Sequence, residues 1–256
     1  MYKQQRLRKI LELMQSNQFW ATKELAEKLN VSQTTIYRDL KELENTDGFL
    51  RSYGGIASIS HGTFIPSEGL EIHQRETRNL EEKLLIAEKT VELVKDGDTF
   101  FVDGSTTCLK FGEALIKSNK KNLTIITNSP RLTLLLAPCR DFHIICTGGT
   151  YLQYLDVLVG MPAEEFVSNV TAEKFFFSVA GIADIGGMDT EQAEVKIKQL
   201  MISRSRFHIM LADHTKFNKF STYLIIKPSK VSTLVTDSMV DQEVLAPFIE
   251  CHVPIL

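Results

Sequence analysis

Small and polar residues follow five short apolar segments of the chain, at the points where buried strands would end. They are Asp103, Gly104, Ser105, Thr106 and Thr107 after TFFV, Thr127 and Asn128 at the end of LTIIT, Gly148 and Gly149 after FHIIC, Gly181 after FFFSV, and Asp213 and Lys216 after FHIML. Several of these groups stand just before a predicted helix, where backbone N–H groups and the helix dipole favour an anion. The chemistry that such residues suit best is the binding of a phosphate group.

The side chains in these loops would have different parts in such a site. Lys216 supplies a positive charge for a phosphate, and the hydroxyl groups of residues 105–107 add hydrogen-bond donors. Asp103 and Asp213 are acceptors that suit the hydroxyl groups of a sugar. A single loop of this kind is also an ordinary strand-to-helix turn, because Gly, Ser, Asp and Thr favour turns. The convergence of five loops favours a binding site.

Six short β-branched or aromatic segments predict the strands that would carry these loops. Helical stretches lie between most of them, and a helical pattern over residues 80–94 precedes them; the segments cover residues 99–102, 123–127, 142–146, 175–179, 207–211 and 232–236. Strands that are apolar on both faces and separated by helices form a mainly parallel sheet covered on both sides. We therefore expect residues 78–256 to form an open α/β domain, with its ligand site at the carboxyl ends of the strands.

The first part of the chain has a different pattern, which predicts three short helices and a hairpin. Apolar residues recur at helical spacing over residues 4–16, and a second helix is expected to begin after Thr22 as its N-cap. Ser32 is expected to cap the third helix, whose apolar stripe would be Ile36, Leu40 and Leu43. The three stripes enclose one small core, as in a helix-turn-helix domain.

The segment after these helices predicts a wing and then a linker. Residues 49–56 hold aromatic and aliphatic residues interrupted by glycines, which indicates a hairpin with a tight turn. After this hairpin the apolar periodicity ends, and the sequence contains Ser, Gly, a Pro and scattered charged residues. We assign residues 1–57 to a winged helix-turn-helix domain, residues 58–77 to an inter-domain linker and residues 78–256 to the α/β domain.

The third predicted helix has a polar and basic outer face. Thr34, Arg38 and Lys41 lie opposite its apolar stripe, and the start of such a helix is the end that reaches base edges in a helix-turn-helix. An alternative is a small helical oligomerisation domain with a solvated face. The residues expected to contact DNA are Ser32, Gln33, Thr34, Thr35, Tyr37, Arg38, Lys41, Arg51 and Tyr53.

The composition excludes several classes of protein. Hydrophobic content of 43% and charged content of 24% are ordinary for a soluble globular protein, and no apolar run is long enough to cross a bilayer. The chain has no secretion signal, so we expect a cytoplasmic protein. Its four cysteines form no CxxC pair and its histidines no HExxH spacing, so no disulfide framework, metal or other cofactor is expected. Residues 1–60 hold nine Lys and Arg against seven Asp and Glu, which is compatible with a DNA-binding head.

The run from Val31 to Gly55, VSQTTIYRDLKELENTDGFLRSYGG, resembles the signature of the DeoR family of bacterial regulators. The family has VSxxTIRRDL followed by a leucine, a glycine turn, an arginine and a GG pair. Tyr37 stands where the family usually has an arginine, and Asp47 stands at the usual glycine. The residues that fit in register are Val31, Ser32, Thr35, Ile36, Arg38, Asp39, Leu40, Leu43, Arg51, Gly54 and Gly55.

The resemblance continues into the second domain and covers nearly the whole chain. The DeoR-type sensor domain is similar in fold to ribose-5-phosphate isomerase and CoA transferases, and its members generally respond to phosphorylated sugars or polyols. Ser105 replaces a common family glycine, Glu173 an aspartate, and Gln192 a glutamate that usually precedes Lys196 by four. The matching parts are Lys83 with Ile86 and Ala87, residues 98–107, residues 127–129, Gly148 and Gly149, Gly160, residues 174–181, Lys196, residues 213–217, and Thr236 with Asp237. The resemblance adds Lys174 to the expected effector site.

These observations predict a transcriptional regulator whose C-terminal domain binds a phosphorylated sugar or polyol that alters its affinity for operator DNA, as a repressor of carbohydrate utilisation. We expect a homodimer or homotetramer, because paired half-sites demand two-fold symmetry, and no membrane partner. One alternative is a sugar-phosphate isomerase with a helical appendage, in which Asp103 or Glu191 would be the base. Another is an architectural DNA-binding protein without an effector. The first alternative leaves the helix-turn-helix unexplained, and the second alternative leaves the polar residues at the strand ends unexplained.

Overall fold

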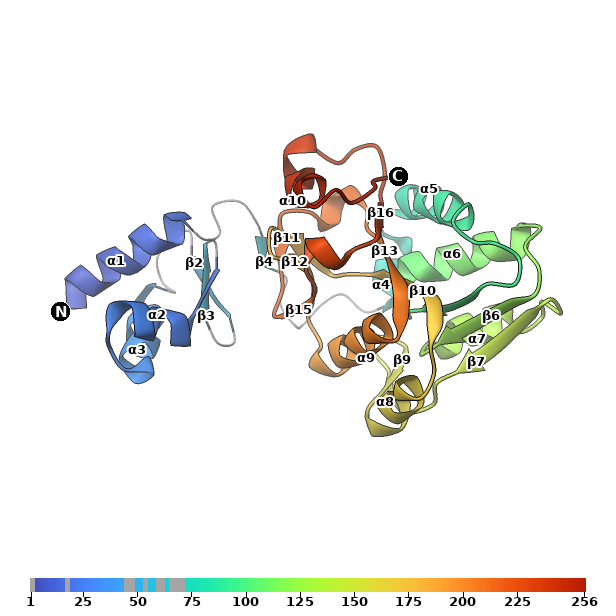
Figure 1. Ribbon diagram of the computed structural model, residues 1–256, viewed down its shortest axis with the longest axis horizontal. Coiled ribbons are helices and arrows are strands. Elements are labelled where there is room, and N and C mark those ends of the chain that lie inside the picture. The colour runs from blue at the N-terminus through green and yellow to red at the C-terminus, as the bar shows by residue number, and fades with distance from the viewer. Residues whose placement is uncertain (1–2, 17–18, 44–48, 53–54, 59–62, 65–71) are drawn as a thin grey trace. The chain divides into compact units, whose positions relative to one another are not determined.

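The computed structural model divides the chain into two compact units, Met1–Phe64 and Ile65–Leu256 (Figure 1). It describes residues 3–16, 19–43, 49–52, 55–58, 63–64 and 72–256. Each of the two units contains its own cluster or clusters of buried apolar side chains. The division between the two units falls between Phe64 and Ile65.

The first unit contains three helices and a small antiparallel sheet. The helices are α1 (Lys3–Ser16), α2 (Thr22–Leu29) and α3 (Gln33–Leu43). Strands β1 (Phe19–Ala21), β3 (Gly55–Ser58) and β2 (Phe49–Ser52) pair in that order, and β4 (Thr63–Phe64) follows. The core is made by Ile10, Leu25, Ala26, Leu29, Ile36 and Leu40, as the helical stripes predict.

Two helix starts in this unit test the predicted caps. Ser32 caps α3 as expected, because its Oγ accepts a hydrogen bond from the Thr35 N–H at 3.2 Å. Thr22 was expected to be the N-cap of α2, and this is wrong: the cap position is Ala21, and the Glu24 carboxylate accepts the Ala21 N–H at 3.2 Å. Strand β1, which the sequence pattern does not predict, contains Ala21, and its pairing with β3 holds that residue in an extended conformation.

The second unit is built on a six-stranded parallel sheet, as predicted. Its order is β16 (Thr233–Val235), β13 (Ser205–Leu211), β10 (Ala172–Ser178), β5 (Thr99–Val102), β6 (Leu123–Thr127) and β7 (Phe142–Cys146). Every neighbouring pair is parallel. All six strands overlap the predicted segments.

Helices cover both faces of this sheet because successive side chains of its strands alternate between two apolar clusters. Phe100 and Phe176 belong to the cluster that contains α5 (Leu80–Val91), α6 (Thr106–Lys117) and α7 (Pro130–Leu136). Phe101, Phe175 and Phe177 belong to the cluster that contains α8 (Met161–Ser168), α9 (Gln192–Ser203) and α10 (Ala246–Glu250). The rings of Phe100 and Phe176 meet edge to face with centroids 5.2 Å apart.

Several small elements beside the sheet are absent from the sequence prediction. A hairpin joins β8 (Thr150–Leu152) and β9 (Val157–Val159), while β11 (Gly181–Ala183), β12 (Gly186–Asp189) and β15 (Tyr223–Ile226) form an antiparallel sheet. Gly186 has φ +130°, and a Cβ atom there would lie 2.0 Å from the Ile226 carbonyl oxygen. The remaining short elements are β14 (Lys219–Phe220) and the 3₁₀ helices η1 (His214–Lys216), η2 (Pro228–Lys230) and η3 (Gln242–Leu245).

The end of the expected linker is helical. Residues 58–77 were assigned to a linker, but Ile72–Thr77 form helix α4 and belong to the second unit. Glu76 fastens this helix, since its carboxylate lies 2.6 Å from Arg131 Nη2 and 3.7 Å from Lys110 Nζ. Residues 59–62 and 65–71 lie outside the described part of the chain. None of the helices in the described residues has the length and apolar character needed to span a membrane.

Candidate functional site

Helix α3 has the polar outer face that its sequence predicts. Ile36 and Leu40 are buried, whereas Gln33, Thr34 and Arg38 are exposed, as is Ser32 at the cap. Tyr37 is 55% exposed and Thr35 is half-buried. Lys41 and Arg51 lie in α3 and β2, but their side chains, like the whole of Tyr53, fall outside the described part of the structure.

A buried ion pair holds α3 against α1. The Arg6 guanidinium donates to the Asp39 carboxylate from Nε at 2.5 Å and from Nη2 at 3.0 Å. Such two-point contacts fix orientation as well as distance. Asp39, which belongs to the DeoR-like run, is therefore placed to position the helix rather than to contact a ligand.

In the second unit, the carboxyl ends of several strands border a pocket of about 170 Å³. It is framed by the α4–α5 turn, the start of α6, the end of β12 and the segment after β13. The residues that line it are Arg75, Arg78, Asn79, Lys83, Thr106, Tyr154, Leu155, Ala180, Asp189, Thr190, Asp213, Thr215, Lys216 and Lys219.

Positive charge dominates this pocket. Five of its lining residues are cationic and two are carboxylates; the cations are Arg75, Arg78, Lys83, Lys216 and Lys219. Burial and the nearby Arg75 lower the pKa of Lys216 to about 8, against the opposing effect of Asp213. Burial also lowers the pKa of Lys83 to about 8. The site is thus short of negative charge, and an anion would relieve the cost of crowding these cations.

The wall formed by the α4–α5 turn is fixed by two side chains. Lys83 Nζ donates to the carbonyl oxygens of Arg75 and Arg78, the latter at 2.6 Å. Asn79 Nδ2 donates to Asp213 Oδ1 at 3.0 Å and to Thr215 Oγ1 at 2.8 Å. The side chain of Lys83 therefore holds the backbone of both arginines of the pocket.

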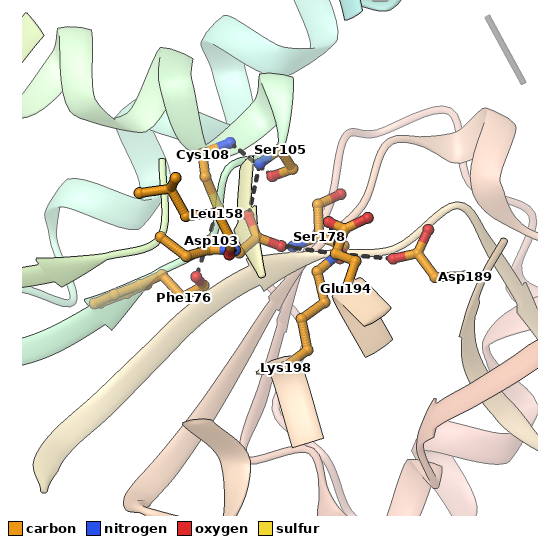
Figure 2. A network of polar contacts seen from close by, with 10 residues as sticks. Asp103, Ser105, Cys108, Leu158, Phe176, Ser178, Asp189, Glu194 and Lys198 are labelled. Atoms are coloured by element: carbon orange, nitrogen blue, oxygen red, sulfur yellow. Dashed lines mark hydrogen bonds and ion pairs between the residues drawn. The ribbon is translucent and has the colours of Figure 1, made fainter. Parts of the chain in front are cut away.

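Beside the pocket lies a buried network around Lys198 (Figure 2). Its ammonium is 2.7 Å from Asp189, 3.0 Å from Glu194 and 3.1 Å from Asp103, and it donates to the Ser178 carbonyl oxygen at 3.0 Å. The three carboxylates raise the pKa of Lys198 well above its ordinary value, although burial opposes them. Asp189 also lines the pocket, so this network supports the pocket from behind.

The carboxylates of this network differ in their preferred charge. Burial would raise the pKa of Asp103, but Lys198 and the hydrogen bonds from Ser105 hold it below the ordinary value. Burial raises the pKa of Glu194 in spite of Lys198 beside it. Asp103 therefore favours the ionised form, and its oxygens accept the backbone N–H groups of Ser105 and Ser178, each at 3.0 Å.

The structure brings some of the expected effector residues to the pocket and leaves others elsewhere. Thr106, Asp213 and Lys216 line it, while Asp103 belongs to the network and Ser105 caps α6 by accepting the Cys108 N–H. The others do not line it; they are Gly104, Thr107, Thr127, Asn128, Gly148, Gly149, Lys174 and Gly181.

These other residues have contacts of their own. Asn128 Nδ2 donates to the Leu158 carbonyl oxygen at 3.2 Å, and Thr127 Oγ1 accepts the Ser129 N–H at 3.1 Å. Gly181 allows a close approach, because a Cβ atom there would lie 2.6 Å from the Lys219 carbonyl oxygen. Lys174 stands near the amino end of β10 and pairs with Asp98 at 2.5 Å, so it faces away from the strand ends that border the pocket.

Sequence reasoning missed Arg75, Arg78 and Lys219 in the pocket, and the acidic partners of Lys198. Lys196, which matches the family pattern in sequence, has a side chain that is 62% exposed and pairs with Glu164. A glutamate does stand four residues before Lys198, at Glu194, and both are buried. This spacing was visible in the sequence and would have identified the pair.

The two units define a class of protein. A three-helix unit with an exposed polar α3 and a small antiparallel sheet is a helix-turn-helix module, and the α/β unit with a cationic pocket at its strand ends is a ligand-binding module. Together they make a DNA-binding transcriptional regulator with a sensor domain.

The chain belongs to the DeoR family of these regulators. Residues 78–238 match the sequence profile of the DeoR C-terminal sensor domain, and residues 6–61 match that of the DeoR-like helix-turn-helix domain. The family assignment confirms the expected resemblance and the regulator hypothesis, and it makes the chain a regulator rather than an enzyme.

Two relatives are similar to the chain over nearly its whole length. The glycerol-3-phosphate regulon repressor of Escherichia coli K12 is 31% identical, over 97% of this chain and 96% of that protein. The lactose phosphotransferase system repressor of Staphylococcus epidermidis is 32% identical, over 93% of both. Among solved structures, ribose 5-phosphate isomerase A from Neisseria gonorrhoeae has a TM-score of 0.38 at 23% identity, over 54% of this chain and 53% of that chain.

Proposed function

We propose that this regulator is a repressor of a carbohydrate-utilisation operon and that its effector is a phosphorylated sugar or polyol bound in the pocket of the second unit. The observation that carries the proposal is the gathering of five cations around a pocket that also presents two carboxylates. A phosphate group satisfies the cations, and hydroxyl groups satisfy acceptors such as Asp213. The names of the two relatives, which concern glycerol 3-phosphate and a phosphotransferase system, agree with this class of ligand.

The proposed effector contacts differ from those expected from the sequence. Arg75, Lys216 and Lys219 are proposed to hold the phosphate, with Thr106 at the N-terminus of α6 as a donor. Asp103, Ser105 and Thr107 would act from behind, by fixing the start of α6. Gly104, Thr127, Asn128, Gly148, Gly149, Lys174 and Gly181 are proposed to have structural roles only.

Operator DNA is proposed to lie against the outer face of α3. Arg38, Gln33 and Thr34 are exposed there, and the start of such a helix reaches base edges in the major groove. Ser32, Thr35, Tyr37, Lys41, Arg51 and Tyr53 complete the proposed DNA contacts. Paired half-sites require two copies of the head, so we propose a homodimer or homotetramer that acts in the cytoplasm, where the chromosome lies.

A pair of variants tests both sites in one experiment. Effector binding is measured by calorimetry and thermal shift against a panel of sugar and polyol phosphates and the corresponding free sugars, and DNA binding by gel shift on an operator selected from genomic fragments. Lys216→Ala should abolish the response to the effector while sparing DNA binding. Arg38→Ala should weaken operator binding by about 1–3 kcal/mol and spare effector binding.

The two variants are controls for each other, and Lys227→Ala, at an exposed lysine outside the pocket, is a neutral control. Binding of free sugars as tightly as of their phosphates would refute the phosphate assignment. Unchanged operator affinity of Arg38→Ala would refute the assigned role of α3. Light scattering on the full chain gives the oligomeric state. A protein that is monomeric in solution and also binds a palindromic operator as one copy would refute the proposed assembly.

A further inference from the structure

We infer that Asp213 selects the effector by requiring a hydrogen-bond donor beside the anion-binding cations, so that the pocket admits hydroxylated phosphoesters and rejects anions that carry no hydroxyl group. This inference rests on the proposed function and refines it. It assigns the choice of ligand class to one carboxylate oxygen.

Asp213 is held rigidly by one of its two oxygens. Oδ1 accepts hydrogen bonds from Asn79 Nδ2 at 3.0 Å, from the Thr215 N–H at 3.0 Å and from the Thr215 hydroxyl. The side chain is 0% exposed, and Asn79 reaches it from a left-handed backbone conformation with φ +51°. The orientation of the carboxylate is therefore set by groups outside the ligand.

The other oxygen of Asp213 has no hydrogen-bond partner. Oδ2 is a buried atom without a donor within the described structure, although the residue lines the pocket. A buried polar atom that lacks a partner is costly, and more so when it carries charge. An oxygen fixed in place and unsatisfied at a binding site is complementary to a donor that arrives with the ligand.

The second carboxylate of the pocket is in a different state. Asp189 accepts a hydrogen bond from Lys198 at 2.7 Å and belongs to the buried network. Lys198 already neutralises the charge of Asp189, so Asp189 has less need of a hydrogen-bond donor from the ligand. Of the two acidic residues that line the pocket, Asp213 is thus the one that distinguishes ligands.

This arrangement discriminates by charge and by hydrogen bonding. The cations attract any phosphate, but a carboxylate fixed among them repels a bare anion and also the carboxylate of a phosphorylated acid. A hydroxyl group on a phosphoester donates to Oδ2 and removes the penalty. Sites built to bind a substrate hydroxyl reject analogues that lack it, because the buried partner is then left unpaired.

The test compares the full-length wild-type protein with Asp213→Asn by calorimetry. The probes are sulfate and phosphoglycolate, neither of which has a hydroxyl donor at pH 8, and the hydroxylated phosphoester of the panel that binds the wild type most tightly. Asparagine is nearly isosteric but uncharged and presents a donor as well as an acceptor. We expect the hydroxylated phosphoester to bind roughly tenfold to a hundredfold more weakly to the variant, whereas sulfate and phosphoglycolate bind as tightly as before or more tightly.

Asp184→Asn is the matched control, because Asp184 is an exposed aspartate in the β11–β12 turn. It should leave all three affinities unchanged. A loss of equal size for all three probes in Asp213→Asn, or no loss for the hydroxylated phosphoester, would overturn the inference while leaving the phosphate pocket in place.

A second variant, Asn79→Gly, serves if Asp213→Asn does not fold. Glycine keeps the left-handed backbone but removes the amide that orients Asp213. It should reduce affinity for the hydroxylated phosphoester more than for sulfate, and equal reductions would overturn the inference. If no hydroxylated phosphoester binds the wild-type protein, the proposed function fails together with the inference; if binding occurs without this selectivity, only the inference fails.

Discussion

At the scale of single residues, the lysines of the pocket combine two requirements that conflict in the free protein. They must be charged to bind a phosphate, yet burial lowers the pKa of Lys83 and of Lys216 to about 8. A phosphate in the pocket would raise both pKa values, because an opposite charge favours the charged form. Ligand binding and protonation of these lysines are therefore linked.

This linkage predicts that effector affinity falls as the pH rises through about 8. A phosphate monoester is already a dianion above its second pKa of about 6, so the lysines are the groups that change charge between pH 7 and 9.5. Deprotonation removes positive charge, and the dissociation constant should rise across that range. Calorimetry at a series of pH values measures the profile. Lys216→Arg keeps its positive charge throughout this pH range, so the dissociation constant of the variant should depend less on pH. A pH profile as steep as that of the wild type would contradict the role given to Lys216.

At the scale of elements, helix α9 carries two lysines that lie about half a turn apart and have different roles. Lys198 lies on the buried side and meets three carboxylates, whereas Lys196 is exposed and pairs with Glu164 at the surface. The network joins the ends of β5 and β12 to this helix. Loss of its contacts should therefore destabilise the fold as well as change the pocket.

We expect Lys198→Met to lower the free energy of unfolding by about 3–5 kcal/mol, because buried carboxylates would lose their counter-charge. Lys196→Met is the matched control on the same helix. It should change the free energy of unfolding by less than about 1 kcal/mol, as is usual when an exposed ion pair is lost. Urea denaturation of both variants measures the difference. Similar losses in the two variants would show that the network contributes little.

Helix α4 is the element that joins the pocket to the chain leading from the first unit. Arg75 lies on it and lines the pocket, while Glu76 fastens it to Arg131 and Lys110. A ligand that draws Arg75 toward its phosphate acts on the same short helix.

At the scale of the whole molecule, coupling between effector and operator must be reciprocal. If the effector changes operator affinity by a factor, typically about 5–150-fold, then saturating operator DNA must change effector affinity by the same factor. Calorimetry with and without operator, together with gel shifts with and without effector, gives both numbers. Lys216→Ala should show no change of operator affinity on addition of the effector. No change of operator affinity when the effector is added to the wild-type protein would contradict the coupling.

The sequence by itself determined the parallel sheet and the polar face of α3. These features depend on local pattern: apolar residues at helical spacing bury one stripe, and strands that are apolar on both faces need helices on both sides. The cap at Ser32 was equally local. The recognition run from Val31 to Gly55 then gave the family.

Only the tertiary structure decided which polar residues share the pocket. The pattern of apolar segments does not specify strand order, and β6 and β7 lie beyond β5, away from β13, so Asn128 and Gly148 end up apart from Lys216. Nor does a residue type reveal its partners: Asp103 and Asp213 look alike in sequence, but one is neutralised by Lys198 and the other keeps an unsatisfied oxygen. Both outcomes depend on contacts between segments that are distant in the chain, which local periodicity cannot encode.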